Sequence, residues 1–366
     1  MKTEEQKLFK ELCKFKNPIM DASLTAFATP TVLGHLFYNR MQGIAYATLK
    51  RNGLLGTVNR EFRNALAGAY MQNIQKNESF QTCIVSLSEI LAACECQVAM
   101  LKGAYLCNHY PEGYRTSNDL DLLVLPKDVT TIGNLLTANG FQQGNVRNDA
   151  FIPATRKEII ESKMMRGETV PFIKEVNLPF MKFFEVDINF SLDYKSEAED
   201  TLLQMLSNVC IKTENGLSIS TLNDVDFFIH LCAHLYKEAT TLPWIEMQRD
   251  MTLYKYSDIY LLLSEMTDEQ LQSVFHRAKD LEMEKICAYA VLEAMALFDI
   301  DRPFAKTISS FVLASDPTFC LRVVSPKDKK IFLYQTPDAT NRFFMDSRVN
   351  DLKEVIAHEK TEYAKK

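Results

Sequence analysis

The sequence contains no run of about 18 apolar residues, the length that a membrane-spanning helix needs, so we expect no transmembrane segment and no membrane partner. Residues 1–7 are charged and lack the apolar stretch of a secretory signal. A strong basic excess is absent too, because the 366 residues carry a formal net charge of −6. Dedicated nucleic-acid-binding proteins usually carry such an excess, so nucleic acid is not an expected partner. These absences favour a cytoplasmic location.

The nine cysteines include no C-x-x-C motif, and Cys94-Glu95-Cys96 is their only close pair. A C-x-C pair alone is weak evidence for a metal. We interpret the cysteines as reduced, mostly buried thiols, with a redox or zinc role as the alternative. We find no internal repeat and no low-complexity segment.

Length and composition predict a globular protein of two or three domains, with 47% hydrophobic and 24% charged residues. Apolar residues at helical spacing dominate the first part of the chain and a later one, and a segment of mixed helix and strand separates them. We expect a helical region over 1–95, an α/β core over 96–195, a helical domain over 196–315 and an irregular tail over 316–366.

The N-terminal helices carry no obvious chemistry, and we interpret them as a layer that covers the core sheet or shapes an acceptor pocket. Asn215-Gly216 is a strong hairpin signal within 209–222. The helices that we expect outside the core are 4–14, 31–49, 59–94, 224–238 and 244–263. In the tail we expect strands at 321–324 and 330–333, an irregular segment over 335–349 and a charged helix or frayed end from 351.

Two carboxylates stand at the head of an apolar run, in Asp119-Leu120-Asp121. Successive side chains of a strand point to opposite faces, so Asp119 and Asp121 share one face. Neighbouring carboxylates repel each other unless a cation lies between them, and Mg²⁺ prefers oxygen ligands. This pattern favours a metal-binding strand. The alternative is a solvated turn that leads into a strand.

A second acidic strand is expected over 183–190. Its alternation places Glu185, Asp187 and Asn189 on one face, with apolar residues on the other. Upstream of the first acidic strand, 98–101 reads as a short buried strand, followed by Lys102-Gly103-Ala104 and a helix to residue 109.

A strand, a glycine, a helix and then two acidic strands resemble the nucleotidyltransferase fold of the DNA polymerase β superfamily. The chain more closely resembles a large family of poorly characterised bacterial nucleotidyltransferases. The resemblance lies in the motifs LKG, YP, R, DLDLLV and VDINF and in the later helical segments. The resemblance covers roughly Leu101 to Leu263. It implies an α+β fold, in which a small mixed sheet with helices is flanked by N-terminal and C-terminal helical regions.

The resemblance implies an enzyme that moves a nucleoside monophosphate from an NTP to a hydroxyl acceptor and releases pyrophosphate. It implies Mg²⁺, with Mn²⁺ as the alternative, held by Asp119, Asp121 and Asp187 as catalytic and metal-binding residues. The nucleotide-binding candidates that it implies are Lys102, Gly103, Ala104, Arg115, His234 and Asp258. A small molecule or a protein side chain is the expected acceptor.

The chain departs from the superfamily pattern at Gly103-Ala104, where a second glycine or a serine is usual. A serine hydroxyl that could contact phosphate is therefore absent. Backbone N–H groups at this helix start can still bind phosphate. For Lys102 the alternative to a phosphate contact is an exposed lysine at a strand end, and for Arg115 it is a brace for the loop before Asp119.

Helix 224–238 carries a polar stripe of Asp226, His230, His234 and Lys237. Three interpretations stay open: a solvated face, a zinc site that includes His230 and His234, or a pocket wall that meets the nucleotide or the acceptor. The family resemblance favours the last, with His234 and Asp258 in recurring helical segments.

Three classes of function follow. The first is a nucleotidyltransferase that acts on a small molecule or a protein. The second is an enzyme of the same fold that modifies RNA or acts as a toxin, against which the net negative charge argues. The third is a catalytically inactive binding protein that keeps the fold. The sequence does not indicate which NTP or which acceptor is used, and it does not indicate the oligomeric state.

Overall fold

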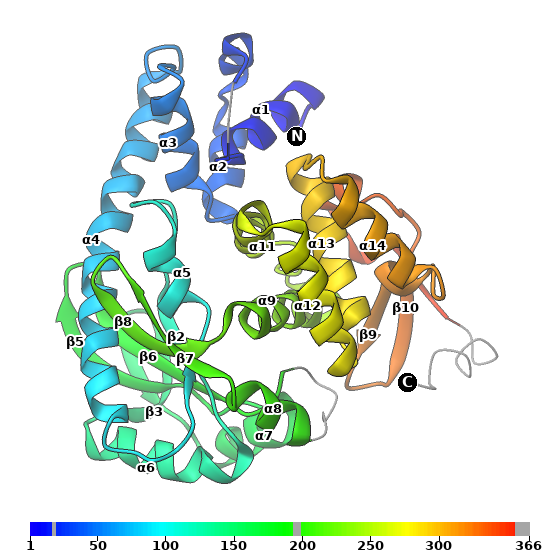
Figure 1. Ribbon diagram of the computed structural model, residues 1–366. Coiled ribbons are helices and arrows are strands. Elements are labelled where there is room, and N and C mark those ends of the chain that lie inside the picture. Colours follow the sequence, from blue (N-terminus) through cyan, green and yellow to red (C-terminus); the bar gives the residue numbers. More distant parts are fainter. Residues whose placement is uncertain (17–19, 193–198, 356–366) are drawn as a thin grey trace. The chain divides into compact units, whose positions relative to one another are not determined.

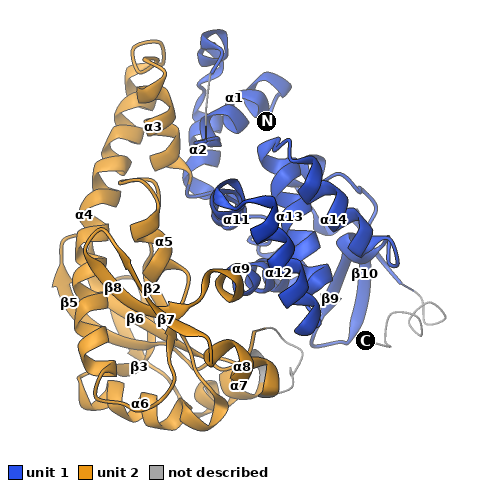
Figure 2. Cartoon of the chain, viewed as in Figure 1, with its two compact units in different colours: residues 1–40, 228–366 blue, residues 41–227 orange. Residues whose placement is uncertain are grey.

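The structure is a computed structural model that describes residues 1–16, 20–192 and 199–355. Packing divides the chain into two compact units (Figure 2). The sheet unit comprises residues 41–227, and the helical unit comprises residues 1–40 and 228–366. This division by packing groups residues 41–95 with the α/β segment, and it groups residues 1–40 with the C-terminal part of the chain.

The sheet unit is built on a mixed six-stranded sheet (Figure 1). Its strands are β1 (Ala99–Met100), β2 (Asp119–Leu123), β3 (Gln142–Arg147), β4 (Ala150–Pro153), β5 (Phe172–Leu178) and β6 (Met181–Asn189). They lie in the order β1-β2-β6-β5-β3-β4. Strands β2 and β6 run parallel, and the other paired strands of this sheet run antiparallel.

The central strands bury one apolar face completely. Leu120 and Leu122 of β2 and Val186 and Ile188 of β6 have no exposed surface. Two helices pack along this sheet, α4 (Arg60–Leu91) against β6 and α6 (Val129–Ala138) against β5. Burial of these strand side chains orients the alternate, acidic residues of β2 and β6 to the opposite face.

Helix α4 has 32 residues and begins after Asn59, whose side chain accepts a hydrogen bond from the Phe62 N–H. Such an N-cap satisfies a backbone donor that the first helical turn leaves unpaired. The other helices of this unit are α3 (Gln42–Arg51), α5 (Gly103–His109), η2 (Pro126–Asp128), α7 (Arg156–Arg166) and α8 (Glu199–Leu206). The predicted hairpin is present as β7 (Val209–Glu214) and β8 (Leu217–Leu222).

Helix α9 (Asp224–Ala239) begins in the sheet unit and continues into the helical unit. The helices of the helical unit are α1 (Thr3–Cys13), η1 (Ala22–Phe27), α2 (Pro30–Tyr38), α10 (Leu242–Glu246), α11 (Leu253–Glu265), α12 (Asp268–Asp280), α13 (Glu284–Phe298), α14 (Pro303–Leu313), η3 (Phe319–Leu321), α15 (Ala339–Phe343) and η4 (Val349–Asp351). A small antiparallel sheet contains β9 (Arg322–Ser325), β10 (Lys330–Tyr334) and β11 (Leu352–Glu354).

The predicted α+β class is confirmed, and several predicted helices need correction. The single helix expected over 31–49 is two helices, α2 and α3, separated at Arg40, whose φ of 56° is left-handed. The helix expected over 244–263 is also two, α10 and α11, with Gln248 at a φ of 57° between them. A non-glycine residue with this backbone conformation cannot continue a right-handed helix.

The tail is more regular than the sequence predicts. Its two predicted strands are present as β9 and β10, but the segment expected to be irregular contains α15. The sequence predicts a charged helix or frayed end from residue 351. Of this segment, residues 356–366 lie outside the described residues, and Leu352–Glu354 form β11, which pairs with β10. This strand is held by hydrogen bonds to residues about 20 positions earlier, so no local pattern reveals it.

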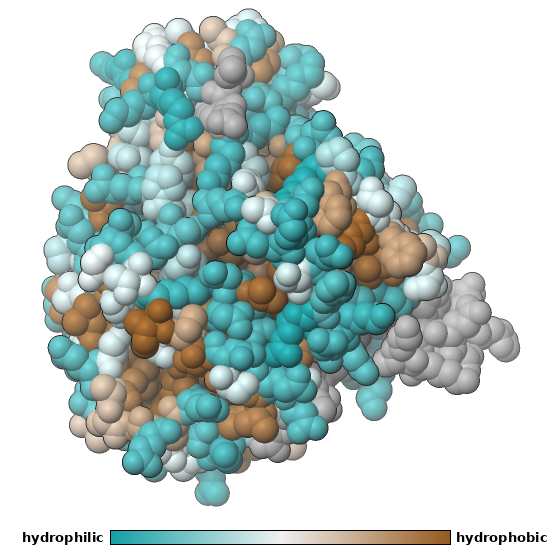
Figure 3. Space-filling view, viewed as in Figure 1, coloured by the Kyte–Doolittle hydropathy of each residue, from teal (hydrophilic) through white to brown (hydrophobic). Residues whose placement is uncertain are grey.

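None of the helices in the described ranges combines the length and apolar character that crossing a bilayer requires. On the face drawn in Figure 3, hydrophilic residues form most of the surface, and apolar ones are interspersed among them.

Candidate active site

The acidic residues of the two predicted strands lie side by side across the parallel pair of β2 and β6. Asp121 is the register partner of Asp187, and Asp119 is the partner of Glu185. Register partners on adjacent strands project to the same face of a sheet. The structure therefore brings Asp119, Asp121 and Asp187 together on the face opposite the apolar core.

Two carboxyl groups of this face, those of Asp121 and Asp187, have raised pKa values, because their surroundings disfavour the charged form. Burial raises the pKa of Asp121, the neighbouring Lys102 opposes the shift, and Asp119 adds to it. The pKa of Asp187 lies well above its usual range because of burial and the charges of Asp121 and Asp119. Negative charge on this face is thus incompletely compensated by the protein's own cations.

Lys102 provides one of those cations. Its Nζ lies 2.9 Å from Asp121 Oδ1, and its side chain is 20% exposed, so it is not the exposed strand-end lysine of the alternative. The Lys102 backbone has φ 44° and ψ −110°, a conformation that costs a non-glycine residue about 1–3 kcal/mol. Asn189 donates a second hydrogen bond to Asp121 Oδ1, at 3.1 Å. The Asp121 carboxylate is therefore held from two sides.

Gly103 begins helix α5 and lies against the loop before β2. A Cβ atom on Gly103 would come within 2.6 Å of Ser117, whose hydroxyl donates to Asp119 Oδ1 at 3.1 Å. The Ala104 N–H already donates to the Leu101 carbonyl. Gly103 is therefore the better placed of the two predicted backbone contacts for phosphate.

Arg115 lies in the same loop and is 7% exposed. Its guanidinium donates to the Thr116 carbonyl, and its own carbonyl accepts from Asn77 of helix α4. The two predicted roles of Arg115, a brace for the loop and a phosphate contact, both stay predictions.

Mg²⁺ fits this site in donor chemistry, since three carboxylates share one face and their charged forms lack full compensation. Within the described ranges, however, no three His, Cys, Asp or Glu side chains already converge as a ligand set. Lys102 also occupies one oxygen of Asp121. Metal binding here would need carboxylate side chains to rotate toward one point.

His234 and Asp258 belong to the helical unit. His234 Nε2 lies 3.5 Å from Glu238 Oε1, and Glu238 also pairs with Lys255. Asp258 lies on α11 and is 4% exposed. Their predicted nucleotide contacts stay predictions.

The polar stripe of α9 is not a solvated face, because Asp226 and His230 are 0% and 5% exposed. Asp226 accepts hydrogen bonds from the side chains of Asn208 and Asn223, which are both within the sheet unit. A zinc site that includes His230 and His234 finds no third ligand group among the described residues.

The segment expected as a helix over 244–263 also carries Arg249 and Asp250. Both residues lie between α10 and α11, and Asp250 pairs with Arg348 at 2.6 Å.

The sequence gives no signal for two charged residues near the acidic face. Glu168 follows α7, forms a bridge to Asn189, and raises the pKa of both Asp121 and Asp187. Lys76 of α4 donates to the side chain of Asn118, next to Asp119, and opposes the raised pKa of Glu185. Both approach the site through contacts between residues far apart in the sequence.

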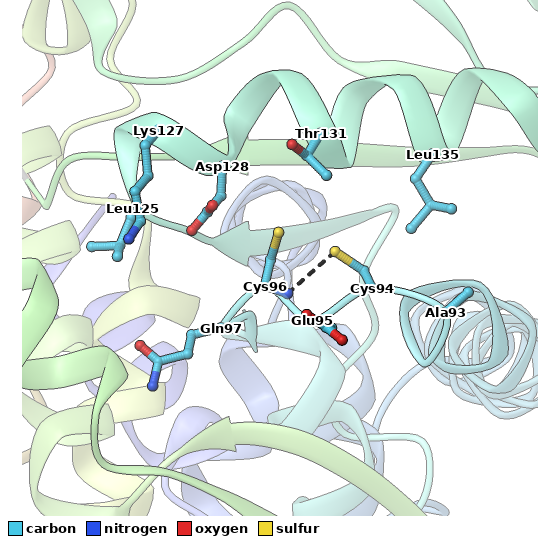
Figure 4. Close-up of a pocket in the computed structure, with 10 residues that line it drawn as sticks. All are labelled: Ala93, Cys94, Glu95, Cys96, Gln97, Leu125, Lys127, Asp128, Thr131 and Leu135. Carbon is cyan, nitrogen blue, oxygen red and sulfur yellow. Dashed lines mark hydrogen bonds between the residues drawn. The ribbon is translucent and has the colours of Figure 1, made fainter.

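The Cys94-Glu95-Cys96 segment lines a separate cavity of about 690 Å³, next to Lys127 and Asp128 (Figure 4). The Cys96 N–H donates to Cys94 Sγ at 3.3 Å. Burial raises the pKa of Cys96 to about 12, so its thiol stays protonated at neutral pH. All nine cysteines are free in the structure, and five of them are buried.

Comparison with known proteins identifies the family of this chain. A family model described as an uncharacterised nucleotidyltransferase matches residues 29–299, which is most of the chain. The chain belongs to this uncharacterised nucleotidyltransferase family. The search of curated proteins finds no match.

One solved structure similar to this nucleotidyltransferase-family chain is an antigenic nucleotidyltransferase-like protein from Paracoccidioides brasiliensis. The two are 13% identical with a TM-score of 0.32, over 57% of this chain and 91% of that one. The match of the nucleotidyltransferase family includes both acidic strands and all of α9 and α11.

Proposed function

We propose that this chain is a Mg²⁺-dependent nucleotidyltransferase that transfers a nucleoside monophosphate from an NTP to a hydroxyl group and releases pyrophosphate. The observation that carries the proposal is the pairing of Asp121 with Asp187 across parallel strands, with Asp119 on the same face. Membership of a nucleotidyltransferase family supports the general kind of reaction.

In this proposal Asp119, Asp121 and Asp187 hold the metal. When bound, Mg²⁺ supplies charge neutralisation at the triphosphate and lowers the pKa of the acceptor hydroxyl. The acceptor oxygen would form a bond to the α-phosphorus and lose its proton to solvent, while the bond to the pyrophosphate oxygen breaks. Mn²⁺ is the alternative metal, and the acceptor is a small molecule or a protein side chain.

The remaining residues bind the triphosphate. Lys102 and Arg115 are the cations that would balance the charge developing on the leaving pyrophosphate. Gly103 would offer a backbone N–H at a point where a larger residue has no space. His234 and Asp258 are proposed nucleotide contacts from the helical unit, to be tested separately as alanine variants.

The test is a panel of four NTPs labelled at the α-phosphate, incubated with the protein, with Mg²⁺ or Mn²⁺, and with fractions of a cell extract. We expect transfer of label to the protein itself or to one fraction. Asp121→Ala and Asp187→Ala should reduce transfer at least about 100-fold while the protein stays folded, because each removes a metal-binding carboxylate.

Asp200→Ala is the matched control, since Asp200 is an exposed aspartate of the sheet unit on α8. It should leave transfer unchanged. Thermal melts of all three variants separate loss of the site from loss of the fold. Transfer that persists in both Asp121→Ala and Asp187→Ala would count decisively against the proposal.

A further inference from the structure

The loop over 110–118 connects helix α5 to strand β2 and carries Arg115 and Ser117. Two amide side chains of helix α4 hold its backbone. Asn73 Nδ2 donates to the Gly113 carbonyl at 3.0 Å, and Asn77 Nδ2 donates to the Arg115 carbonyl at 2.6 Å. The loop is thus fixed by contacts with side chains from residues about 40 positions earlier.

Both asparagines are nearly inaccessible, with 6% and 8% exposure for Asn73 and Asn77. Asparagine is a poor residue for a helix interior, and burial of an unsatisfied polar group costs about 1–3 kcal/mol. These residues therefore serve neither the helix nor an apolar core. Their positions four residues apart place both amides on one side of α4, toward the loop.

Other contacts also restrict the conformation of this loop. The ring of Tyr70, on α4, lies 2.5 Å from where a Cβ atom of Gly113 would be, and Gly113 has a φ of +76°. The Arg51 guanidinium of α3 donates to the Tyr114 hydroxyl at 2.7 Å. Farther along the loop, Ser117 lies against Gly103. The loop is thus held by α4 at Gly113 and Arg115 and lies against the start of α5 at Ser117.

We propose that Asn77 is a positioning residue for the triphosphate site. By donating to the Arg115 carbonyl, it fixes the turn that carries Arg115 and leads through Ser117 to Asp119. This inference rests on the proposed function, since it assigns Asn77 a role in the binding of that function's substrate. It gives helix α4, which lies outside the α/β core expected from the sequence, a role in substrate affinity.

Calorimetric titration with Mg²⁺ and inorganic tripolyphosphate tests this inference without knowledge of the base. Asn77→Ala should weaken binding about fivefold to tenfold, the typical loss for one hydrogen bond. Asn77→Leu, which keeps the branched shape but removes the donor, should show the same loss. Gln72→Ala is the control, because Gln72 is an exposed amide on the same helix.

A double-mutant cycle with Arg115→Ala supplies the readout that a purely structural role would not change. If Asn77 acts through Arg115, Asn77→Ala should cause no further loss of affinity in the Arg115→Ala background. A lower melting temperature with unchanged tripolyphosphate affinity overturns the inference, and so does full additivity in the cycle. If the wild-type protein binds neither tripolyphosphate nor any NTP, the proposed function fails first, and the inference fails with it.

Discussion

At the scale of single residues, the acidic face is a source of instability that the fold tolerates. Asp121 is 6% exposed, pairs with Lys102 and accepts a hydrogen bond from Asn189. Asp187 has a pKa well above its usual range. A carboxylate in such surroundings favours protonation, and a divalent cation would reverse that preference. The same residues can therefore weaken the metal-free protein and bind metal.

Asp187→Asn should stabilise the metal-free protein, by an amount that grows with pH. The ordinary pKa of Asp187 is 3.8 and its folded pKa is raised, so the folded state binds the proton more tightly. The stability that this proton supplies is complete below about pH 3.8 and is lost as the pH rises through the folded pKa. Asparagine does not titrate. We expect a gain on the order of 1 kcal/mol at neutral pH, the scale of a poorly compensated buried group.

Urea unfolding in EDTA at pH 5 and pH 8 measures this effect, with Asp200→Asn as the exposed control. The gain for Asp187→Asn should be larger at pH 8, while the control should show little difference at either pH. A gain that is equal at both pH values, or a loss of stability at pH 8, contradicts the assigned pKa direction.

The candidate site is only partly encoded in local sequence. Alternation along a strand was enough to place Asp119 with Asp121, and Glu185 with Asp187, on shared faces. It could not predict that Asp121 and Asp187 are register partners, because residues 124–180 separate the strands. Glu168 and Lys76 reach the site from a loop and from a distant helix, so no spacing rule identifies them.

At the scale of elements, two glycines should respond to the same substitution in opposite ways. At Gly103 a new Cβ would lie 2.6 Å from Ser117, so Gly103→Ala should cost about 1–3 kcal/mol and reduce transfer activity by displacing the Asp119 turn. Gly68 lies within α4 with no atom within 4 Å of a new Cβ, so Gly68→Ala should stabilise by about 0.5–1 kcal/mol. Thermal and urea unfolding measure both, and the same sign for both variants would refute the argument.

A buried ion pair attaches α15 to α13 within the helical unit. Arg342 and Glu293 form two hydrogen bonds of 2.6 and 2.7 Å at 1% and 7% side-chain exposure. Arg342→Ala should destabilise by about 3–5 kcal/mol, because it leaves a carboxylate buried without its partner.

The double variant Arg342→Met with Glu293→Leu tests the cause of the stability loss in Arg342→Ala. It removes both charges, so the attraction is lost but no unpaired charge stays buried. Apolar side chains of similar size should recover most of the stability that Arg342→Ala loses. Melting temperatures of the single and double variants decide between the two. A double variant as unstable as Arg342→Ala would show that specific geometry, rather than charge compensation, holds this contact.

Elements with a strong local signal were predictable, and those defined by distant partners were not. Periodic apolar residues predicted α4, and Asn215-Gly216 predicted the hairpin of β7 and β8. In contrast, the predicted helices are interrupted at Arg40 and Gln248 by left-handed backbone, which neither residue type predicts. Strand β11 exists because β10 is available to pair with it.

At the scale of the whole molecule, the chain starts in the helical unit, continues through the sheet unit and then returns to the helical unit. The helical unit takes residues from both ends of the sequence, and the sheet unit takes the middle. Composition changes along a sequence cannot reveal such a division, because grouping residues 1–40 with residues after 227 depends on contacts far apart in the chain. The hydrogen bonds from Asn73 and Asn77 likewise link α4 to the loop before β2 across about 40 residues.

Net charge leads to a prediction about partners. With a charge of −6, the protein lacks the overall attraction that gives non-specific RNA binding its affinity, typically with a Kd of about 10⁻⁴–10⁻⁶ M. We expect a 20-nucleotide single-stranded RNA, measured by fluorescence anisotropy at 150 mM salt, to bind more weakly than about 10 µM. The best NTP of the panel should bind more tightly than this RNA when Mg²⁺ is present. Submicromolar RNA affinity that falls steeply with salt would instead indicate a local basic surface that overrides the net charge, and would favour an RNA acceptor over a small molecule or a protein.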